Sequence, residues 1–180
     1  MAANMRNQGE RRGGRWRWAM WGGAAALLLL PAVAMRIGDN GVNWTGSDFV
    51  VFGAMLLLAC GTFELGVWLS RDRAYRAAFG IAIVAGFLMT WANLAVGIIG
   101  SENNLANLMF FGVLLVGAIG ALIARFKPQG MARALVATAI AQAMAGVVAL
   151  IQGSVEGVGL SAFFVVVWLI SAGLFRKAAA

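Results

Sequence analysis

The sequence predicts an all-α integral membrane protein, folded as a bundle of six transmembrane helices. Of its 180 residues, 62 % are hydrophobic and 12 % are charged, whereas soluble domains are about half apolar and a quarter charged. A soluble fold of this length could not bury so much apolar surface, and the excess would drive aggregation. The apolar runs also lack the roughly ten-residue alternating segments of transmembrane strands. Helices remain as the solution, because they satisfy their backbone hydrogen bonds internally.

Six apolar runs have the required length. A helix needs about 20 mainly apolar residues to cross a hydrocarbon core roughly 30 Å thick. Short polar segments separate the runs, and none is long enough for a separate soluble domain. We therefore expect one transmembrane domain at 16–175, between a basic tail at 1–15 and a C-terminal tail at 176–180. The predicted spans are 16–35, 49–69, 77–99, 105–126, 131–151 and 158–175.

The distribution of basic residues predicts the orientation. In a six-span bundle, 13 of the 14 Lys and Arg residues fall on one side of the membrane, and Arg36 falls on the other. Because short loops rich in Lys and Arg stay in the cytoplasm, both termini are predicted to lie inside. The net charge of +7 is then an orientation signal that also attracts anionic lipids at the cytoplasmic face. We expect no nucleic acid partner, and the inner membrane of a bacterium as the location.

The first span, 16–35, has two interpretations. Basic residues followed by an apolar core and an Ala-Val-Ala triplet ending at Ala34 are typical of a cleaved secretory signal. Cleavage would leave five spans. The apolar run is longer than a usual signal core, however, and it begins with three tryptophans, which are typical of a membrane interface. We therefore expect the first span to be retained.

Glu64 is the acidic residue well inside a predicted span, near the cytoplasmic end of 49–69. A charge at the helix centre costs about 2.5–3.5 kcal/mol, and neighbouring apolar residues offset it by about 0.3–0.6 kcal/mol each. The carboxylate still requires a partner. One interpretation is a partly hydrated structural carboxylate that pairs with Arg76 or Arg125. The alternative is a binding site for a proton or a transported cation.

Other polar side chains occur in the third and fifth spans, namely Thr90 and Asn93 in the third and Thr138 and Gln142 in the fifth. At about 1.5 Å of rise per residue, these side chains and Glu64 stand at successive depths of the membrane. If the helix faces converge, the five residues form one intramembrane polar network. Such a network is either a sealed set of hydrogen bonds or a route for protons or a small cation.

The fifth span carries four alanines at a strict four-residue spacing: Ala137, Ala141, Ala145 and Ala149. Small residues at this spacing let helix backbones approach closely. We predict that these alanines form a helix-packing face. The fifth span is then expected at the centre of the bundle, with little lipid contact.

The segment between the third and fourth spans holds a second group of candidate residues. Glu102, Asn103, Asn104 and Asn107 fall at the outer interface. Asparagines are favourable N-cap residues for the incoming helix, and a glutamate complements the positive end of its dipole. A cluster of amides and a carboxylate could instead recognise a polar ligand.

Two segments resemble known proteins. Residues 93–107, together with the stretch Arg-Phe-Lys-Pro-Gln-Gly-Met-Ala-Arg at 125–133, resemble small bacterial multi-pass proteins of uncharacterised function. That resemblance implies no activity and no functional residues. The stretch Glu-Leu-Gly-Val-Trp, which begins at Glu64, is similar to a segment of small multidrug exporters, in which a membrane glutamate binds protons and cations. Those exporters have four helices and carry the glutamate in the first, whereas Glu64 lies in the second span.

The chain lacks several catalytic residue types. It has no histidine, and its single cysteine, Cys60, lies in an apolar run. The spans pair no nucleophile with a base and hold no paired carboxylates, so we expect no enzyme, no cofactor and no metal site. We predict an accessory or scaffold subunit that packs through small-residue helix faces, in a homo-oligomer or a larger membrane complex. The alternative is a small proton- or cation-coupled transporter or permeation pathway that uses Glu64.

Overall fold

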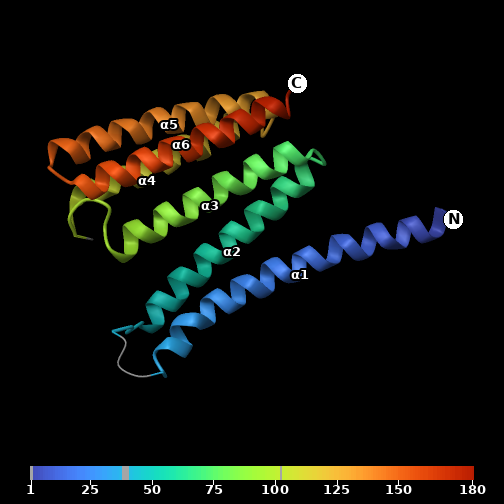
Figure 1. The fold of residues 1–180 in the computed structure, drawn as a ribbon, viewed down its shortest axis with the longest axis horizontal. Helices are drawn as coiled ribbons and strands as arrows, with labels where there is room; N and C mark the ends of the chain where they lie inside the picture. The colour runs from blue at the N-terminus through green and yellow to red at the C-terminus, as the bar shows by residue number, and fades with distance from the viewer. Residues whose placement is uncertain (1, 38–40, 102) are drawn as a thin grey trace. The chain divides into compact units, whose positions relative to one another are not determined.

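The computed structural model describes the backbone of residues 2–37, 41–101 and 103–180, and the side chains of these ranges from residue 16 onward. In this part of the chain six helices are long and apolar enough to cross a membrane (Figure 1). The predicted fold class of six transmembrane helices is confirmed. The elements are α1 (Ala2–Ala34), α2 (Gly46–Leu69), α3 (Arg73–Ala95), the short 3-10 helix η1 (Leu105–Asn107), α4 (Leu108–Ile123), α5 (Pro128–Ile151) and α6 (Val155–Lys177).

Most helix boundaries differ from the predicted spans by a few residues, and three differences have a clear origin. α1 begins at Ala2, so the segment expected as a separate tail at 1–15 continues the first helix, whose apolar part is Trp16–Ala34. α3 ends at Ala95 and not at residue 99. The reason is Gly97, whose φ of +72° lies in the left-handed region that glycine reaches without steric cost and that interrupts the helix.

The turn between α4 and α5 is a third difference. α4 ends at Ile123 and not at residue 126, because Arg125 and Phe126 adopt left-handed φ angles of 49° and 58°. This conformation is unfavourable for residues with a Cβ. The Phe126 carbonyl accepts a hydrogen bond from the Tyr75 hydroxyl across 2.9 Å, which ties the turn to the start of α3. Pro128 then opens α5 at the first helical position, where the missing N–H leaves no intrahelical bond unmade.

The chain forms two compact units, Met1–Gly61 (unit 1) and Thr62–Ala180 (unit 2). Unit 1 holds α1 and the first part of α2. There α2 begins behind a polar cap, in which the Asp48 carboxylate accepts hydrogen bonds from the Thr45 N–H at 2.7 Å and the Thr45 hydroxyl at 2.8 Å. Trp44 packs edge-on against Phe49, with ring centroids 5.3 Å apart.

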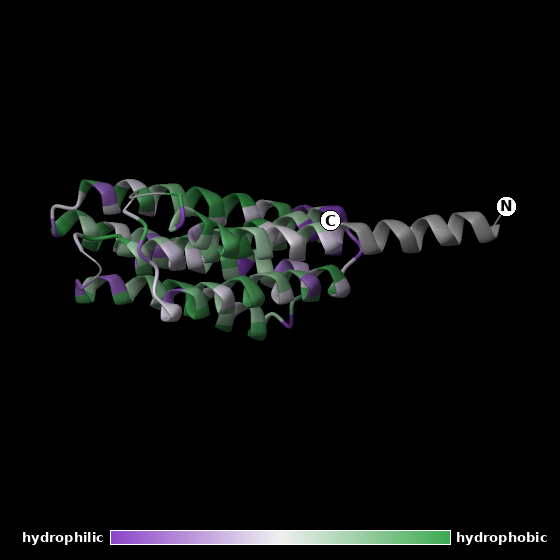
Figure 2. Ribbon diagram, turned by 90° about the horizontal axis from the view of Figure 1, so that it is seen from below, coloured by the Kyte–Doolittle hydropathy of each residue, from purple (hydrophilic) through white to green (hydrophobic). Residues whose placement is uncertain are grey.

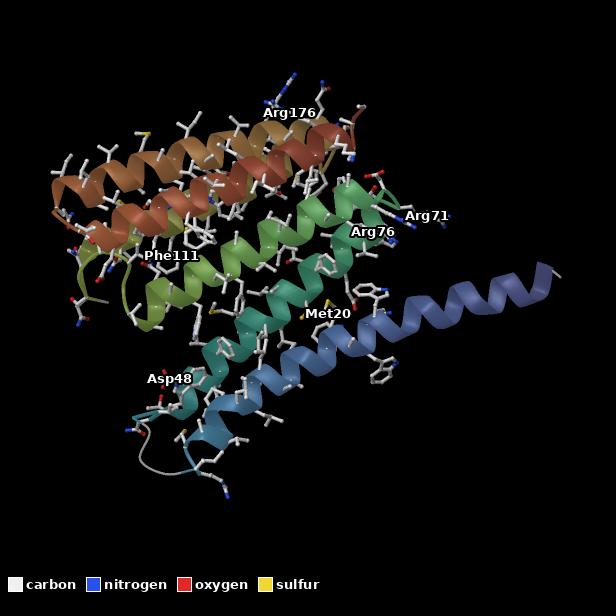
Figure 3. All side chains as sticks on the ribbon, in the orientation of Figure 1. Met20, Asp48, Arg71, Arg76, Phe111 and Arg176 are labelled. Carbon is white, nitrogen blue, oxygen red and sulfur yellow. The ribbon has the colours of Figure 1, made fainter. Side chains whose placement is uncertain are left out.

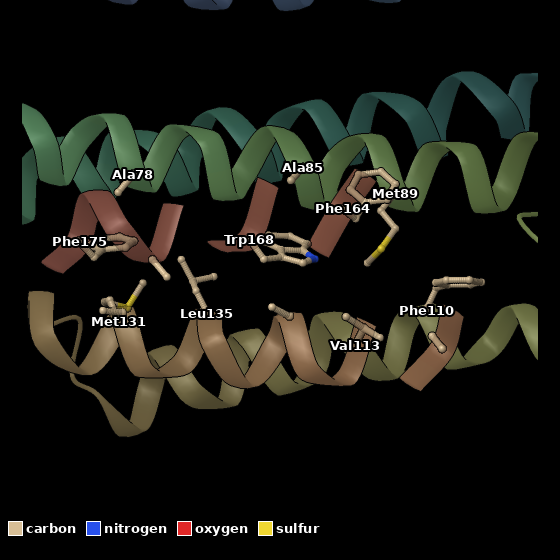
Figure 4. Packing of buried hydrophobic residues seen from close by; sticks show 14 of the residues in the cluster. Ala78, Ala85, Met89, Phe110, Val113, Met131, Leu135, Phe164, Trp168 and Phe175 are labelled. Carbon is tan, nitrogen blue, oxygen red and sulfur yellow. The ribbon is translucent and has the colours of Figure 1, made fainter. Parts of the chain in front are cut away.

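Unit 2 holds the rest of α2 and the whole of α3, α4, α5 and α6. α5 packs against both α4 and α6, and α3 packs against α6, so that α3, α6 and α5 run side by side (Figure 1). Their shared core combines aromatic and methionine side chains with alanines (Figure 4). At one end of this core Tyr75, Phe79 and Phe175 form an aromatic group with ring centroids 5.0–6.4 Å apart.

Glycines allow α5 to approach its neighbours closely. A Cβ on Gly120 of α4 would lie 2.7 Å from the Ala134 Cβ of α5. A Cβ on Gly146 of α5 would lie 2.9 Å from the Ser161 Cβ of α6. Because real side-chain atoms do not approach so closely, α5 packs against α4 and α6 through positions that hold no side chain on one partner.

The basic residues of unit 2 gather at one end, which we call the basic end. It comprises the α2–α3 turn, the α4–α5 turn and the last turn of α6. Figure 3 shows Arg71, Arg76 and Arg176 together at this end, with Phe111 toward the opposite end. Hydrophobic residues cover the helices between their polar ends (Figure 2). Within unit 2 the basic residues are sorted as the sequence predicts, and the side of the membrane on which the basic end lies stays a prediction.

Candidate functional site

Asn107 organises the turn between α3 and α4. Its Oδ1 accepts hydrogen bonds from the backbone N–H groups of Ile98 and Ile99, at 3.1 and 2.8 Å. Its Nδ2 donates to the Ser101 carbonyl at 2.7 Å and to the Ile99 carbonyl at 3.4 Å. The Asn93 side chain donates in turn to the Asn107 carbonyl at 3.0 Å. With 3 % of Asn107 exposed, its amide is occupied by the protein backbone.

The remaining residues of the predicted outer cluster have different surroundings. Asn104 accepts a hydrogen bond from the Ala106 N–H at 3.0 Å and so caps η1. It also donates to the Gln152 side chain at 3.2 Å, which links this turn to the one between α5 and α6. Asn103 is exposed, and Glu102 lies outside the described residues. A cavity of about 310 Å³ here is lined by Asn93, Leu94, Asn103, Asn104, Leu105, Asn107, Leu108 and Phe111.

The threonines of the predicted intramembrane network bond to their own helices. Thr90 donates to the Gly86 carbonyl at 2.8 Å, and Thr138 donates to the Ala134 carbonyl at 2.9 Å. Both bonds follow the i to i−4 pattern that hydroxyls commonly adopt within helices. Each threonine hydroxyl therefore has a partner one turn away on its own helix.

The amides of the network reach other elements. Gln142 donates to the Ser161 hydroxyl of α6 at 3.4 Å, whereas Asn93 reaches the Asn107 carbonyl. The second amide atoms, Gln142 Oε1 and Asn93 Oδ1, are buried and lack a hydrogen-bond partner in the described part of the chain. Among Thr90, Asn93, Thr138 and Gln142, the described contacts join no two to each other. The structure thus brings Asn93 to Asn107 and Gln142 to Ser161, and these are two separate hydrogen-bonded groups.

Glu64 lies half-buried on the part of α2 that belongs to unit 2. Neither arginine considered as its partner pairs with it among the described contacts. Arg76 donates from Nε to the Ser70 carbonyl at 2.8 Å and from Nη2 to the Val67 carbonyl at 3.0 Å. These carbonyls end α2, so Arg76 caps that helix. Arg125 is exposed in the α4–α5 turn.

The four alanines of the predicted packing face do not share one environment. Ala145 and Ala149 are buried, Ala141 is half-buried and Ala137 is exposed. The reason is geometric: a helix turns 100° per residue, so a four-residue step advances the face by about 40°. Over the twelve residues from Ala137 to Ala149 the stripe rotates by about 120° around the helix.

Of the six candidate spans α5 has the largest buried share, and it also has an exposed face, so its small lipid contact stays a prediction. Large apolar side chains stand exposed along one face of α5: Ile140, Met144, Val147 and Ile151. Their spacing of four, three and four residues follows the helical period and marks a continuous stripe. This face is exposed in the described structure. α5 is therefore packed on two sides and open on a third.

Two buried serines of α6 were missed in the sequence. Ser171 donates to the Ala78 carbonyl of α3 at 2.7 Å, and Ser161 meets Gln142 of α5. Both are at most 2 % exposed. The signal was present, because Ser161, Trp168 and Ser171 recur on one helical face, but serine is common enough in membrane helices that this face does not stand out.

An apolar groove between α3 and α4 is the second missed feature. Its volume is about 430 Å³. Thr62, Ala118 and Leu122 on its rim are exposed, so the groove opens at the surface of unit 2. The Trp168 indole contributes to its floor, and the Trp168 Nε1 is buried without a hydrogen-bond partner in the described residues. Several further lining residues are small: Ala82, Gly86, Gly117 and Ala121.

The described side chains offer no metal centre, since no three Cys, Asp or Glu side chains in them lie together as a metal ion would require. Comparison with known proteins gives no further identification: no protein-family model, no curated protein and no solved structure matches the chain. The two resemblances noted in the sequence therefore gain no support from these comparisons. By its six long apolar helices the chain is a multi-pass membrane protein.

Proposed function

We propose that this protein is a non-enzymatic multi-pass protein of the bacterial inner membrane that serves as an accessory or scaffold subunit. In this proposal, the groove between α3 and α4 receives one transmembrane helix of a partner subunit. The observation that carries the proposal is the groove itself, because its walls hold small residues on both helices. Glycine and alanine let a third helix approach the backbone, which is the usual way in which membrane helices associate.

The shape of the groove supports a helix as occupant. On one wall a Cβ on Gly86 would lie 3.4 Å from a Leu114 methyl and 4.0 Å from the Trp168 ring, so the glycine leaves room at ordinary contact distance. On the other wall Ala118 and Ala121 are one turn apart on α4, and Leu122 stands at the rim. Leu122 is 65 % exposed, which leaves an apolar edge for the side chains of an incoming helix.

The other chemical features support a packing role more than transport. The hydroxyls of Thr90 and Thr138 bond to carbonyls of their own helices, and Asn107 is occupied by the turn that it closes. Gln142 and Ser161 join α5 to α6. These polar groups hold helices and turns together, as expected of a sealed packing arrangement.

The test is the size of the native assembly. A tagged copy is extracted from its own membrane directly into lipid nanodiscs, and the particle mass is measured. Wild type should run as an assembly larger than one chain. Ala118→Phe, which fills the groove from its rim, should release the single chain, whereas Ile119→Phe, on the neighbouring exposed position, should leave the assembly intact.

A folding control separates this result from misfolding. Purified Ala118→Phe should unfold at the same temperature as wild type. A wild type that runs as a single chain, or an Ala118→Phe variant that keeps the full assembly, would refute the proposed role of the groove.

A further inference from the structure

A cavity of about 350 Å³ lies at the basic end of unit 2, between the first turns of α5 and the last turns of α6. Two guanidinium groups line it, that of Arg133 on α5 and that of Arg176 on α6. Both side chains are exposed. Since one water occupies about 30 Å³ of liquid, the cavity has room for a phosphate group and part of its substituent. Its complete lining is Gln129, Ala132, Arg133, Arg176, Ala179 and Ala180.

In the side chains that the structure describes, no carboxylate forms an ion pair with Arg133 or with Arg176. The start of α5 adds donors to the same place, because Lys127 at the N-cap supplies no side-chain hydrogen bond to the free backbone N–H groups of the first turn. Gln129 belongs to that first turn and lines the cavity. Guanidinium groups and free N–H groups together favour an oxyanion.

The position of the cavity along the helices indicates what kind of oxyanion. Arg133 is followed on the same exposed face of α5 by Ala137 and then by Ile140 and Met144, the first two residues of the exposed apolar stripe. Arg176 is preceded on α6 by exposed Leu169. Both arginines therefore stand at the ends of apolar helix faces, and long basic side chains at helix ends commonly extend to the headgroup region of a bilayer.

We propose that Arg133 and Arg176 bind the phosphate of an anionic phospholipid, whose acyl chains lie along the exposed face of α5. Arginine suits this role because its planar fork can contact two phosphate oxygens at once. The stripe supplies the surface for the chains, and the cavity between α5 and α6 supplies the specificity for the headgroup. This lipid site is independent of the groove between α3 and α4.

The experiment measures the lipids that the purified protein retains. Wild type is reconstituted in nanodiscs of equal parts dioleoyl-phosphatidylglycerol and dioleoyl-phosphatidylcholine, released into detergent and weighed by native mass spectrometry. Phosphatidylglycerol should be retained in clear excess over phosphatidylcholine. Arg133→Gln and Arg176→Gln should each lower the retained phosphatidylglycerol by about tenfold, as the loss of a charged hydrogen bond implies.

Matched variants make the result specific. Lys177→Gln removes the same charge beside Arg176 but not from the cavity lining, and it should change retention by less than about twofold. Arg133→Lys keeps the charge and loses the fork, so it should weaken retention as well. Equal losses in Lys177→Gln and Arg176→Gln would overturn the site in favour of a general surface charge.

A last arm separates the lipid from free phosphate. Inorganic phosphate added in excess should not displace phosphatidylglycerol from wild type. Displacement would show an anion site without lipid specificity and would overturn the assignment. If a glutamine variant fails to fold, the comparison of Arg133→Lys with wild type still decides the proposal, because it preserves charge and size.

Discussion

The side-chain amide of Asn93 donates to the backbone carbonyl of Asn107, 14 residues later, across 3.0 Å. This bond joins the last turn of α3 to the start of α4, and the Asn107 side chain closes the loop between them. The sequence places Asn93 among the candidates for an intramembrane network and Asn107 among the candidates for an outer ligand site. In the structure both residues stabilise the turn between α3 and α4. In each, the Nδ2 group bonds to backbone carbonyls of the chain.

Asn107→Ala should lower the free energy of unfolding by about 2–4 kcal/mol, because each buried group left without its partner costs about 1–3 kcal/mol. The groups that would lose their acceptor are the backbone N–H groups of Ile98 and Ile99, and both residues are 2 % exposed. Reversible unfolding in mixed micelles, followed by circular dichroism, measures the change. Asn103→Ala, in the exposed neighbour, should change stability by less than about 0.5 kcal/mol. Equal losses of stability in the two variants would contradict the role of Asn107 in stabilising the turn between α3 and α4.

Gly120→Ala should destabilise unit 2 by about 1–3 kcal/mol, the usual cost of overpacking a close contact. The added methyl would lie 2.7 Å from the Ala134 Cβ and 3.3 Å from its Cα, so the two helices must move apart. Gly112 of the same helix is the matched control, since a Cβ there meets nothing within 4 Å. Gly112→Ala should be neutral or stabilising by about 0.5–1 kcal/mol, because alanine favours the helix. The same unfolding assay compares the pair, and a reversed order would show that α4 and α5 do not pack through Gly120.

Ala149→Leu and Ala137→Leu should differ sharply although both lie in the same four-residue stripe. Ala149 is 0 % exposed and its Cβ lies 3.1 Å from the position of a Gly157 Cβ, so a leucine there should cost about 1–3 kcal/mol or prevent folding. Ala137 is exposed, and leucine there should be nearly silent. Thermal unfolding monitored by tryptophan fluorescence distinguishes them. Matching losses at the two positions would mean that the whole stripe packs.

Glu64→Gln tests the transporter alternative. If the protein is a packing subunit, wild-type proteoliposomes should carry no more proton or monovalent cation flux than protein-free liposomes under a pH gradient. The Glu64→Gln variant should behave in the same way. A pH-driven flux that is present in wild type and absent in Glu64→Gln would favour the transporter over the scaffold. Circular dichroism of both samples confirms that they remain folded.

The orientation of the chain can be tested with topology reporters. Because 13 of the 14 basic residues fall on one side of a six-span bundle, fusions after Arg71, Lys127 and Lys177 should report the cytoplasm. Fusions after Asn43 and Gln152 should report the periplasm. A periplasmic signal at Lys177 would contradict the predicted orientation with both termini inside.

The number of helices and the sorting of charge were predictable because they depend on local sums. A segment crosses a membrane when about 20 consecutive residues have a favourable total transfer free energy. That sum is calculated from one segment alone and does not depend on the helices that pack around it. Span ends were less predictable, because Gly97 and the pair Arg125 and Phe126 take left-handed φ angles inside apolar stretches. Hydropathy does not register such backbone angles.

The residues that join the helices were only partly predictable. Asn93, Asn107 and Gln142 stand out as polar residues in apolar surroundings, so the sequence marks them. Their partners do not stand out, since Asn107 bonds to backbone groups and Gln142 bonds to Ser161 of another helix. Pairing of this kind depends on the rotation of each helix about its axis.

The sequence by itself determines that this chain is a membrane protein of six helices, and that the basic residues of unit 2 fall at one end of its helices. Tertiary structure alone decides that Ala149 is buried while Ala137 faces outward, and that α3 and α4 leave a groove above Trp168. The physical reason is the solvent. In water a buried face is apolar and an exposed face is polar, so the sequence period reveals which is which. In lipid both faces are apolar, and the buried one is chosen by the fit of small side chains, which is a property of two helices together.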